Sequence, residues 1–138
     1  MEGFCLELLH QGYEAMLSAR GYDVDWEEDT LTAHYIGFMD KLPLCREWQI
    51  DIVPQFYIYS DKHLGGEEAA KYAPRIDFRF MKWFKETKTE YFAEAKNLSE
   101  KNWKKKSGAF VSTSYYYSRY IKTGISHLLT EYYPNNCV

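Results

Sequence analysis

The chain has few cysteines, and their positions suggest no shared site. Its 138 residues include only Cys5, Cys45 and Cys137, which are odd in number, widely spaced and free of any Cys-x-x-Cys pair. This argues against a disulfide framework and against a structural zinc site, and it predicts reduced, mostly buried thiols. The four histidines show no mutual metal-ligand spacing either, so each is expected to be a packing or surface residue.

Other sequence signals are also missing. The chain has no apolar run long enough to span a bilayer and no charged, apolar, small-residue leader, which predicts a cytoplasmic protein without membrane contact. The glycine pair in "LGGEE" lacks the lysine and hydroxyl of a phosphate-binding P-loop, and no Gly-x-Ser-x-Gly motif is present. ATP hydrolysis and serine-hydrolase chemistry are therefore set aside.

Charge is unevenly divided along the chain. Residues 1–74 carry 5 basic and 14 acidic side chains, whereas residues 75–138 carry 12 basic and 6 acidic ones. A basic C-terminal half suits a polyanion such as nucleic acid, while the acidic half would limit indiscriminate binding. A solvated surface with segregated charges is the alternative. A single domain over residues 1–138 is expected from the length.

Apolar periodicity predicts helices at both ends of the chain. A first helix is expected over residues 4–20, stopped by Gly21, and a second from an N-cap at Asp25 to Pro43. After the hairpin described below comes the polar, basic stretch 97–110, and a long helix is expected over 114–133. These helices would flank a small sheet.

Three strands are expected between the helices. Residues 47–60 alternate with period two, but Pro54 cannot donate to a ladder, so this strand should be at an edge, bulged or broken there. A connection with a short helical turn follows over 61–74. Strands over 75–84 and 90–96, joined by "KETK", form a hairpin. The resulting fold class is α/β, with a small mixed sheet flanked by helices.

The hairpin places charges among apolar residues. Glu94 and Lys96 are two apart, so they share one face of a strand while Ala95 points away. Two hairpin registers set Asp77 opposite Glu94 or opposite Lys96, and in either register an Asp and a Glu lie close together on one side. Such a pair repels unless a cation lies between its members. Mg²⁺, which takes one or two carboxylates together with phosphate oxygens, would supply that cation.

A second interpretation of the same residues remains open. The segment can be a surface hairpin with ordinary salt bridges, Asp77 to Lys96 or Arg79 to Glu94. In the metal-site interpretation, Lys96 instead orients or deprotonates a water, or neutralises charge on a transferring phosphate.

The arrangement "PRID", 16 intervening residues and "EAK" resembles the PD-(D/E)xK nuclease superfamily, also called restriction-endonuclease-like. The resemblance covers about residues 26–133, with the helix over 4–20 as an addition. It implies metal ligation by Asp77, Glu94 and the Ala95 carbonyl, with Lys96 as the water-activating lysine. Glu28 on the first core helix is a further candidate ligand; its rival role is helix capping.

The resemblance extends in part to the terminal helix. Tyr120, Gly124 and Ile125 match compact bacterial and phage members, but His127 and Leu128 stand where an Arg-Phe pair is expected. Members commonly continue with another strand, so a trimmed chain whose sheet is completed by a partner, or a homodimer, is anticipated.

Several side chains near the proposed site suit nucleic acid. Point charges flank a stacking ring in the basic stretch, and two more cations lie one helical turn apart further on; a solvated loop and a solvated helix face are the alternatives. The candidates are Lys101, Trp103, Lys104, Lys105, Lys106, Arg119 and Lys122.

The resemblance therefore implies a Mg²⁺-dependent deoxyribonuclease, with Mn²⁺ able to substitute, acting in phage defence or DNA repair. The competing hypothesis is a nuclease-like module without chemistry that binds nucleic acid or a partner protein in a larger complex.

Overall fold

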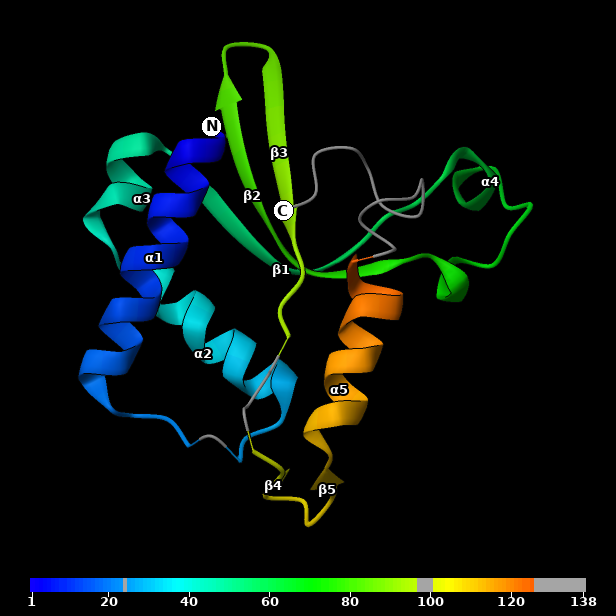
Figure 1. Ribbon diagram of the computed structural model, residues 1–138. Coiled ribbons are helices and arrows are strands. Elements are labelled where there is room, and N and C mark those ends of the chain that lie inside the picture. The colour runs from blue at the N-terminus through cyan, green and yellow to red at the C-terminus, as the bar shows by residue number, and fades with distance from the viewer. Residues whose placement is uncertain (24, 97–100, 126–138) are drawn as a thin grey trace.

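A computed structural model of the chain describes residues 1–23, 25–96 and 101–125 (Figure 1). The elements are arranged as an α/β domain in which helices pack on a small antiparallel sheet. Within the described part of the chain, no helix is long and apolar enough to cross a membrane.

Two long helices open the chain. α1 (Glu2–Ala19) ends where Arg20 adopts a left-handed conformation, and α2 (Glu28–Asp40) runs back across it. Gly12 of α1 lies so close to Met39 of α2 that a Cβ at Gly12 would come within 2.2 Å of the Met39 Cγ. The Tyr35 hydroxyl also donates a hydrogen bond to the Leu9 carbonyl at 2.5 Å. The two helices are therefore in close contact.

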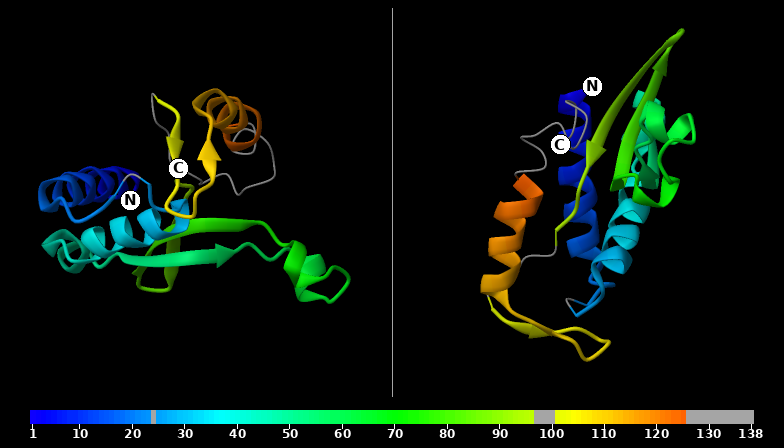
Figure 2. Two further views of the ribbon diagram at one scale, coloured as in Figure 1. Left: turned by 90° about the horizontal axis from the view of Figure 1, so that it is seen from below. Right: turned by 90° about the vertical axis from the view of Figure 1, so that its right-hand side faces the viewer.

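The sheet has the order β1-β2-β3, and both strand pairs are antiparallel, so the expectation of a mixed sheet was wrong. β1 (Asp51–Tyr57), β2 (Arg75–Phe84) and β3 (Thr87–Ala93) follow one another along the chain, with the four-residue helix α4 (Asp61–Leu64) and a 3-10 turn (Ala70–Tyr72) between β1 and β2. Figure 2 shows α1 and α2 on one side of this sheet. The core lies between them and includes Cys5, Leu8, Met39, Phe78 and Phe80.

β1 is an edge strand of this sheet, as Pro54 predicted, and its ladder is interrupted beside the proline. Pro54 pairs with Phe78 and Phe56 pairs with Ile76, but the intervening Gln55 and Asp77 are not paired. Gln55 has a φ of 47°, in the left-handed region that a residue other than glycine rarely adopts. The pairing between β1 and β2 is therefore interrupted at Gln55, the position of β1 that lies opposite Asp77.

Beyond β3 the described chain forms a second, smaller sheet and a helix. β4 (Trp103–Lys104) and β5 (Phe110–Val111) pair as an antiparallel hairpin, and α5 (Thr113–Arg119) continues into a π-helical turn (Tyr120–Ile125). The segment expected to be a polar basic stretch thus contains strand pairing. Of the helix expected over 114–133, residues 126–133 lie outside the described residues, as do His127 and Leu128.

Several predicted boundaries were wrong. The strand expected over 47–60 begins only at Asp51, because the residues before it form a helix, α3 (Pro43–Trp48). Pro43 is the first residue of this helix, a position at which proline is common. Asp25 is not the N-cap of α2; Glu27 is, and it makes no side-chain capping bond. The second hairpin strand spans Thr87–Ala93 rather than 90–96, so Glu94, Ala95 and Lys96 follow the strand instead of belonging to it.

Candidate functional site

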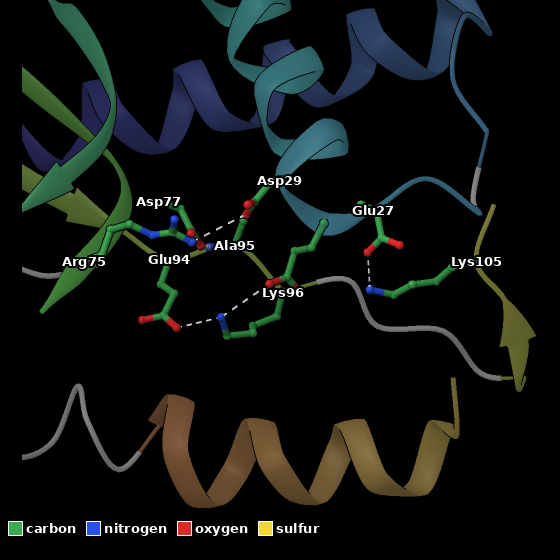
Figure 3. A network of polar contacts seen from close by, with 9 residues as sticks. Glu27, Asp29, Arg75, Asp77, Glu94, Ala95, Lys96 and Lys105 are labelled. Atoms are coloured by element: carbon green, nitrogen blue, oxygen red, sulfur yellow. Dashed lines mark hydrogen bonds and ion pairs between the residues drawn. The ribbon is translucent and has the colours of Figure 1, made fainter. Parts of the chain in front are cut away.

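Asp77 lies in β2 beside the end of β3. The last hairpin pair is Phe78 with Ala93, so the same register sets Asp77 opposite Glu94, one of the two registers expected from the sequence. The chain beyond β3 remains attached here, because the backbone N–H of Ala95 donates to the Asp77 Oδ2 at 2.7 Å (Figure 3). A carboxylate thus secures the segment that carries Glu94 and Lys96.

Lys96 lies between two glutamates. Its Nζ is 2.6 Å from the Glu94 Oε1 and 3.8 Å from the Oε1 of Glu28, the first residue of α2 (Figure 3). All three side chains are partly shielded from solvent. Glu28 therefore approaches Lys96 from the helix, and the N-cap of α2 is Glu27.

The electrostatics of this cluster favour a charged lysine. Burial acts to lower the pKa of Lys96, but its hydrogen bond to Glu94 and the charges of Glu28, Glu94 and Asp77 together raise that pKa above 10.5. The pKa of Asp77 is also raised from 3.8, mainly by burial and further by the charges of Glu94 and Glu28, against the Ala95 hydrogen bond and Lys96. One cation thus serves three carboxylates.

One oxygen of the cluster lacks a partner within the part of the chain that the structure describes. The Glu94 Oε2 is buried and makes no hydrogen bond to those residues, whereas the other oxygen of the same carboxylate faces Lys96. A buried carboxylate oxygen without a donor is unfavourable, and metal coordination is one of the ways in which proteins satisfy such an atom.

The oxygen ligands of the cluster are of the type that a small hard cation takes. No group of three or more Asp, Glu, His or Cys side chains is close enough to hold a metal among the described residues, so a protein-only cage is absent there. Mg²⁺ does not need one, because it binds through one or two carboxylates with water and substrate phosphate completing the shell. Asp77, Glu94 and the Ala95 carbonyl would supply the protein's share.

The ion pairs differ from those of the salt-bridge interpretation. Arg79 pairs with Glu90 rather than Glu94, and its guanidinium lies 3.8 Å from the centre of the Phe56 ring. Lys96 pairs with Glu94 and Glu28 rather than with Asp77. Arg79 thus forms no ion pair with Glu94, because it is engaged with Glu90.

The expected nucleic-acid side chains fall into two groups. Lys105 is ion-paired with Glu27 at 2.5 Å, and the Trp103 ring packs against Tyr116 with centroids 5.8 Å apart. These two are therefore engaged within the protein. The remaining candidates are exposed on the β4–β5 hairpin, just before it, or on the last helix: Lys101, Lys104, Lys106, Arg119 and Lys122.

Two features near the site were not anticipated from the sequence. Glu27 accepts hydrogen bonds from the Lys105 Nζ and, at 2.8 Å, from the Ser107 Oγ, which lowers the pKa of Glu27. Arg75 of β2 lies 3.8 Å from Asp29 of α2. No local signal indicates either contact, because each joins segments that are distant in the sequence.

A pocket adjoins Asp77 and one face of α2. It has a volume of about 450 Å³ and is bounded by one side of α2, by Pro54 and Gln55 of the interrupted strand β1, and by Asp77. A second hollow of about 270 Å³ lies between α1 and α2, with Ala95 and Lys96 on its wall. Two hollows therefore border the cluster, and Thr32 of α2 lines both of them.

Comparisons with protein-family models, with curated proteins and with solved structures give no match for this chain.

Proposed function

We propose that this protein is a metal-dependent nuclease that hydrolyses phosphodiester bonds in DNA, built on a restriction-endonuclease-like core. The observation that carries the proposal is the buried, unpartnered Glu94 Oε2, in a cluster where Asp77 is opposite Glu94 and Lys96 is adjacent. Two carboxylates and a lysine at one sheet end are the chemical groups that the PD-(D/E)xK resemblance implies.

The protein's residues would divide the work as follows. Asp77, Glu94 and the Ala95 carbonyl would hold Mg²⁺, and Glu28 faces the same lysine from the helix. The bound ion would supply charge stabilisation for the phosphate and a lowered pKa for the attacking water. The raised pKa of Lys96 keeps its Nζ protonated at neutral pH, so Lys96 orients the water or neutralises phosphate charge as a cation instead of accepting a proton.

The direct test is cleavage of DNA by the purified chain in Mg²⁺ or Mn²⁺, with a chelator control. Glu94→Gln removes the charge at the unpartnered oxygen and should abolish metal-dependent cleavage. It should also abolish the rise in melting temperature that Mg²⁺ produces in the parent by binding only the folded state. Glu86→Gln changes an exposed glutamate in the turn of the same hairpin and should leave both properties intact.

Lys96→Ala separates catalysis from binding. It should lower the single-turnover cleavage rate by roughly 10² while leaving DNA affinity nearly unchanged, as expected for a positioned catalytic group. A Lys96→Ala variant that cleaves as fast as the parent would remove the "EAK" segment from the mechanism.

The pairing of Lys96 with two glutamates favours a second candidate function. A lysine held by Glu94 and Glu28 can be a purely structural contact between α2 and the segment that follows β3. In that case the domain is a nuclease-like module that binds nucleic acid or a partner protein without chemistry. A parent protein that binds DNA and neither cuts it nor gains stability from Mg²⁺ or Mn²⁺ would establish this alternative.

A further inference from the structure

The pocket beside Asp77 has a size and lining that suit a nucleobase. Its volume of about 450 Å³ is within the range of roughly 300 to 1,000 Å³ common for small-molecule sites. Ala33, Ile36 and Pro54 provide apolar walls for a flat ring, and Asp29, Thr32 and Gln55 provide polar groups at its edges. These are the two kinds of contact by which proteins read a base that has left its stack.

The position of the pocket ties it to the proposed chemistry. Asp77 lines the pocket and also accepts the Ala95 N–H within the Glu94 and Lys96 cluster. A base in the pocket would therefore bring its own phosphodiester group to the carboxylates. The interruption of β1 contributes to this geometry, because Gln55, which turns out of the ladder with a φ of 47°, is opposite Asp77 and forms part of the wall.

The charges of the lining select among ligands. Two carboxylates, Asp29 and Asp77, make the pocket unfavourable for a phosphate and favourable for a neutral ring with N–H donors. The Arg75 guanidinium pairs with Asp29 at 3.8 Å, a long distance for an ion pair (Figure 3). When a base occupies Asp29, Arg75 becomes available to the phosphate of the same nucleotide.

We infer that this pocket binds a guanine base of the substrate strand, with the Asp29 carboxylate accepting the two adjacent N–H donors of its Watson–Crick edge. Among the DNA bases only guanine presents two such neighbouring donors, N1–H and N2–H, to one carboxylate. The inference rests on the proposed function, since it names the nucleotide that the proposed nuclease would hold beside the scissile phosphate.

The test is a titration of the full chain with the four deoxynucleosides, without metal, followed by NMR of the methyl groups of Thr32, Ala33 and Ile36. Deoxyguanosine should shift these methyl resonances at lower concentration than deoxyadenosine, deoxycytidine or thymidine. Asp29→Asn should weaken deoxyguanosine binding about tenfold or more, the scale of one charged hydrogen-bonding group. Asp40→Asn, at the exposed opposite end of α2, is the matched control and should bind as the parent does.

The outcomes separate this inference from the proposed function. Methyl resonances that no nucleoside shifts, or that all four shift equally in parent and Asp29→Asn, would overturn the guanine pocket. If the parent cleaves DNA but does not bind deoxyguanosine, the guanine pocket is wrong and the nuclease proposal stands. If the parent binds deoxyguanosine selectively but cleaves no DNA, the guanine pocket stands and the nuclease proposal is wrong.

Discussion

At the scale of single residues, Asp77 is in an environment that disfavours its charge. It is half-buried, and two glutamates of like charge act on it, while Lys96 is shared with both of them. Its pKa is raised above the ordinary value of 3.8, so the folded protein binds a proton at Asp77 more readily than the unfolded chain does. The carboxylate is therefore maintained at a cost to stability, as is common for functional groups.

Asp77→Asn should consequently stabilise the metal-free protein at neutral pH. The amide oxygen can still accept the Ala95 N–H, while the unfavourable charge is gone. The stability that a protonated Asp77 provides is fully present below about pH 3.8 and is lost as the pH rises through the raised pKa of Asp77. The free energy of unfolding of Asp77→Asn should therefore exceed that of the parent increasingly as the pH rises through that pKa.

Thermal unfolding of parent and variant across this pH range measures the effect. Asp51→Asn, on the exposed start of β1, is the control and should shift the melting temperature little. A parent that melts above Asp77→Asn at neutral pH without metal would contradict the prediction.

At the scale of elements, the β4–β5 hairpin is attached to the start of α2. Lys105 and Ser107 both donate to Glu27, and the Lys106 backbone N–H donates to the Asp25 carbonyl at 2.8 Å. The lysines of one short hairpin therefore differ in what they can offer a polyanion. Lys104 and Lys106 are exposed, whereas Lys105 already faces a carboxylate.

The three lysines should respond differently to substitution by alanine. Lys104→Ala and Lys106→Ala should each weaken DNA binding and reduce the slope of log affinity against log salt by up to about one. Lys105→Ala should change that slope little, because its charge is compensated by Glu27 before DNA arrives. Filter binding across a salt series measures all three, and a Lys105→Ala effect as large as the others would show that DNA displaces Glu27.

The α1–α2 contact has its own requirement for a small residue. A methyl group at Gly12 would meet the fully buried Met39, whereas a methyl group at Gly37, also within a helix, would meet nothing within 4 Å. Gly12→Ala should lower the free energy of unfolding by about 1 to 3 kcal/mol through overpacking.

Gly37→Ala is the matched control. It should raise the free energy of unfolding by about 0.5 to 1 kcal/mol, because alanine favours the helix over glycine. Urea denaturation of both variants measures the change in the free energy of unfolding. An equal change for Gly12→Ala and Gly37→Ala would show that Gly12 is not at a tight contact.

At the scale of the whole molecule, the hairpin was the most predictable part. The burial of Ile76, Phe78 and Phe80 follows the strict alternation visible in "RIDFRF", and this alternation also limits the register to few choices. That regularity limited Asp77 to a position opposite Glu94 or opposite Lys96, and the register of the structure selects Glu94.

Other features depend on contacts that sequence patterns do not encode. "PLCREW" forms α3 although its last two residues, Glu47 and Trp48, belong to the segment expected to be a strand. Ile50, an apolar residue of the same segment, is buried just outside β1. Glutamine has no preference for a left-handed φ, so the interruption at Gln55 had no signal beyond the neighbouring proline. The link from Glu27 to Lys105 spans most of the chain and arises only from tertiary packing.

The two buried core thiols can be used to measure how often the helices open. Cys5 of α1 is fully buried, with its pKa raised to about 11 by burial, and Cys45 of α3 is buried with its Sγ donating to the Met39 carbonyl at 3.1 Å. A thiol reagent attacks only an exposed thiolate, so neither cysteine reacts while the helices remain on the sheet. In a Cys137→Ser background, the rate at which each cysteine is alkylated therefore reports how often α1 or α3 separates from the sheet.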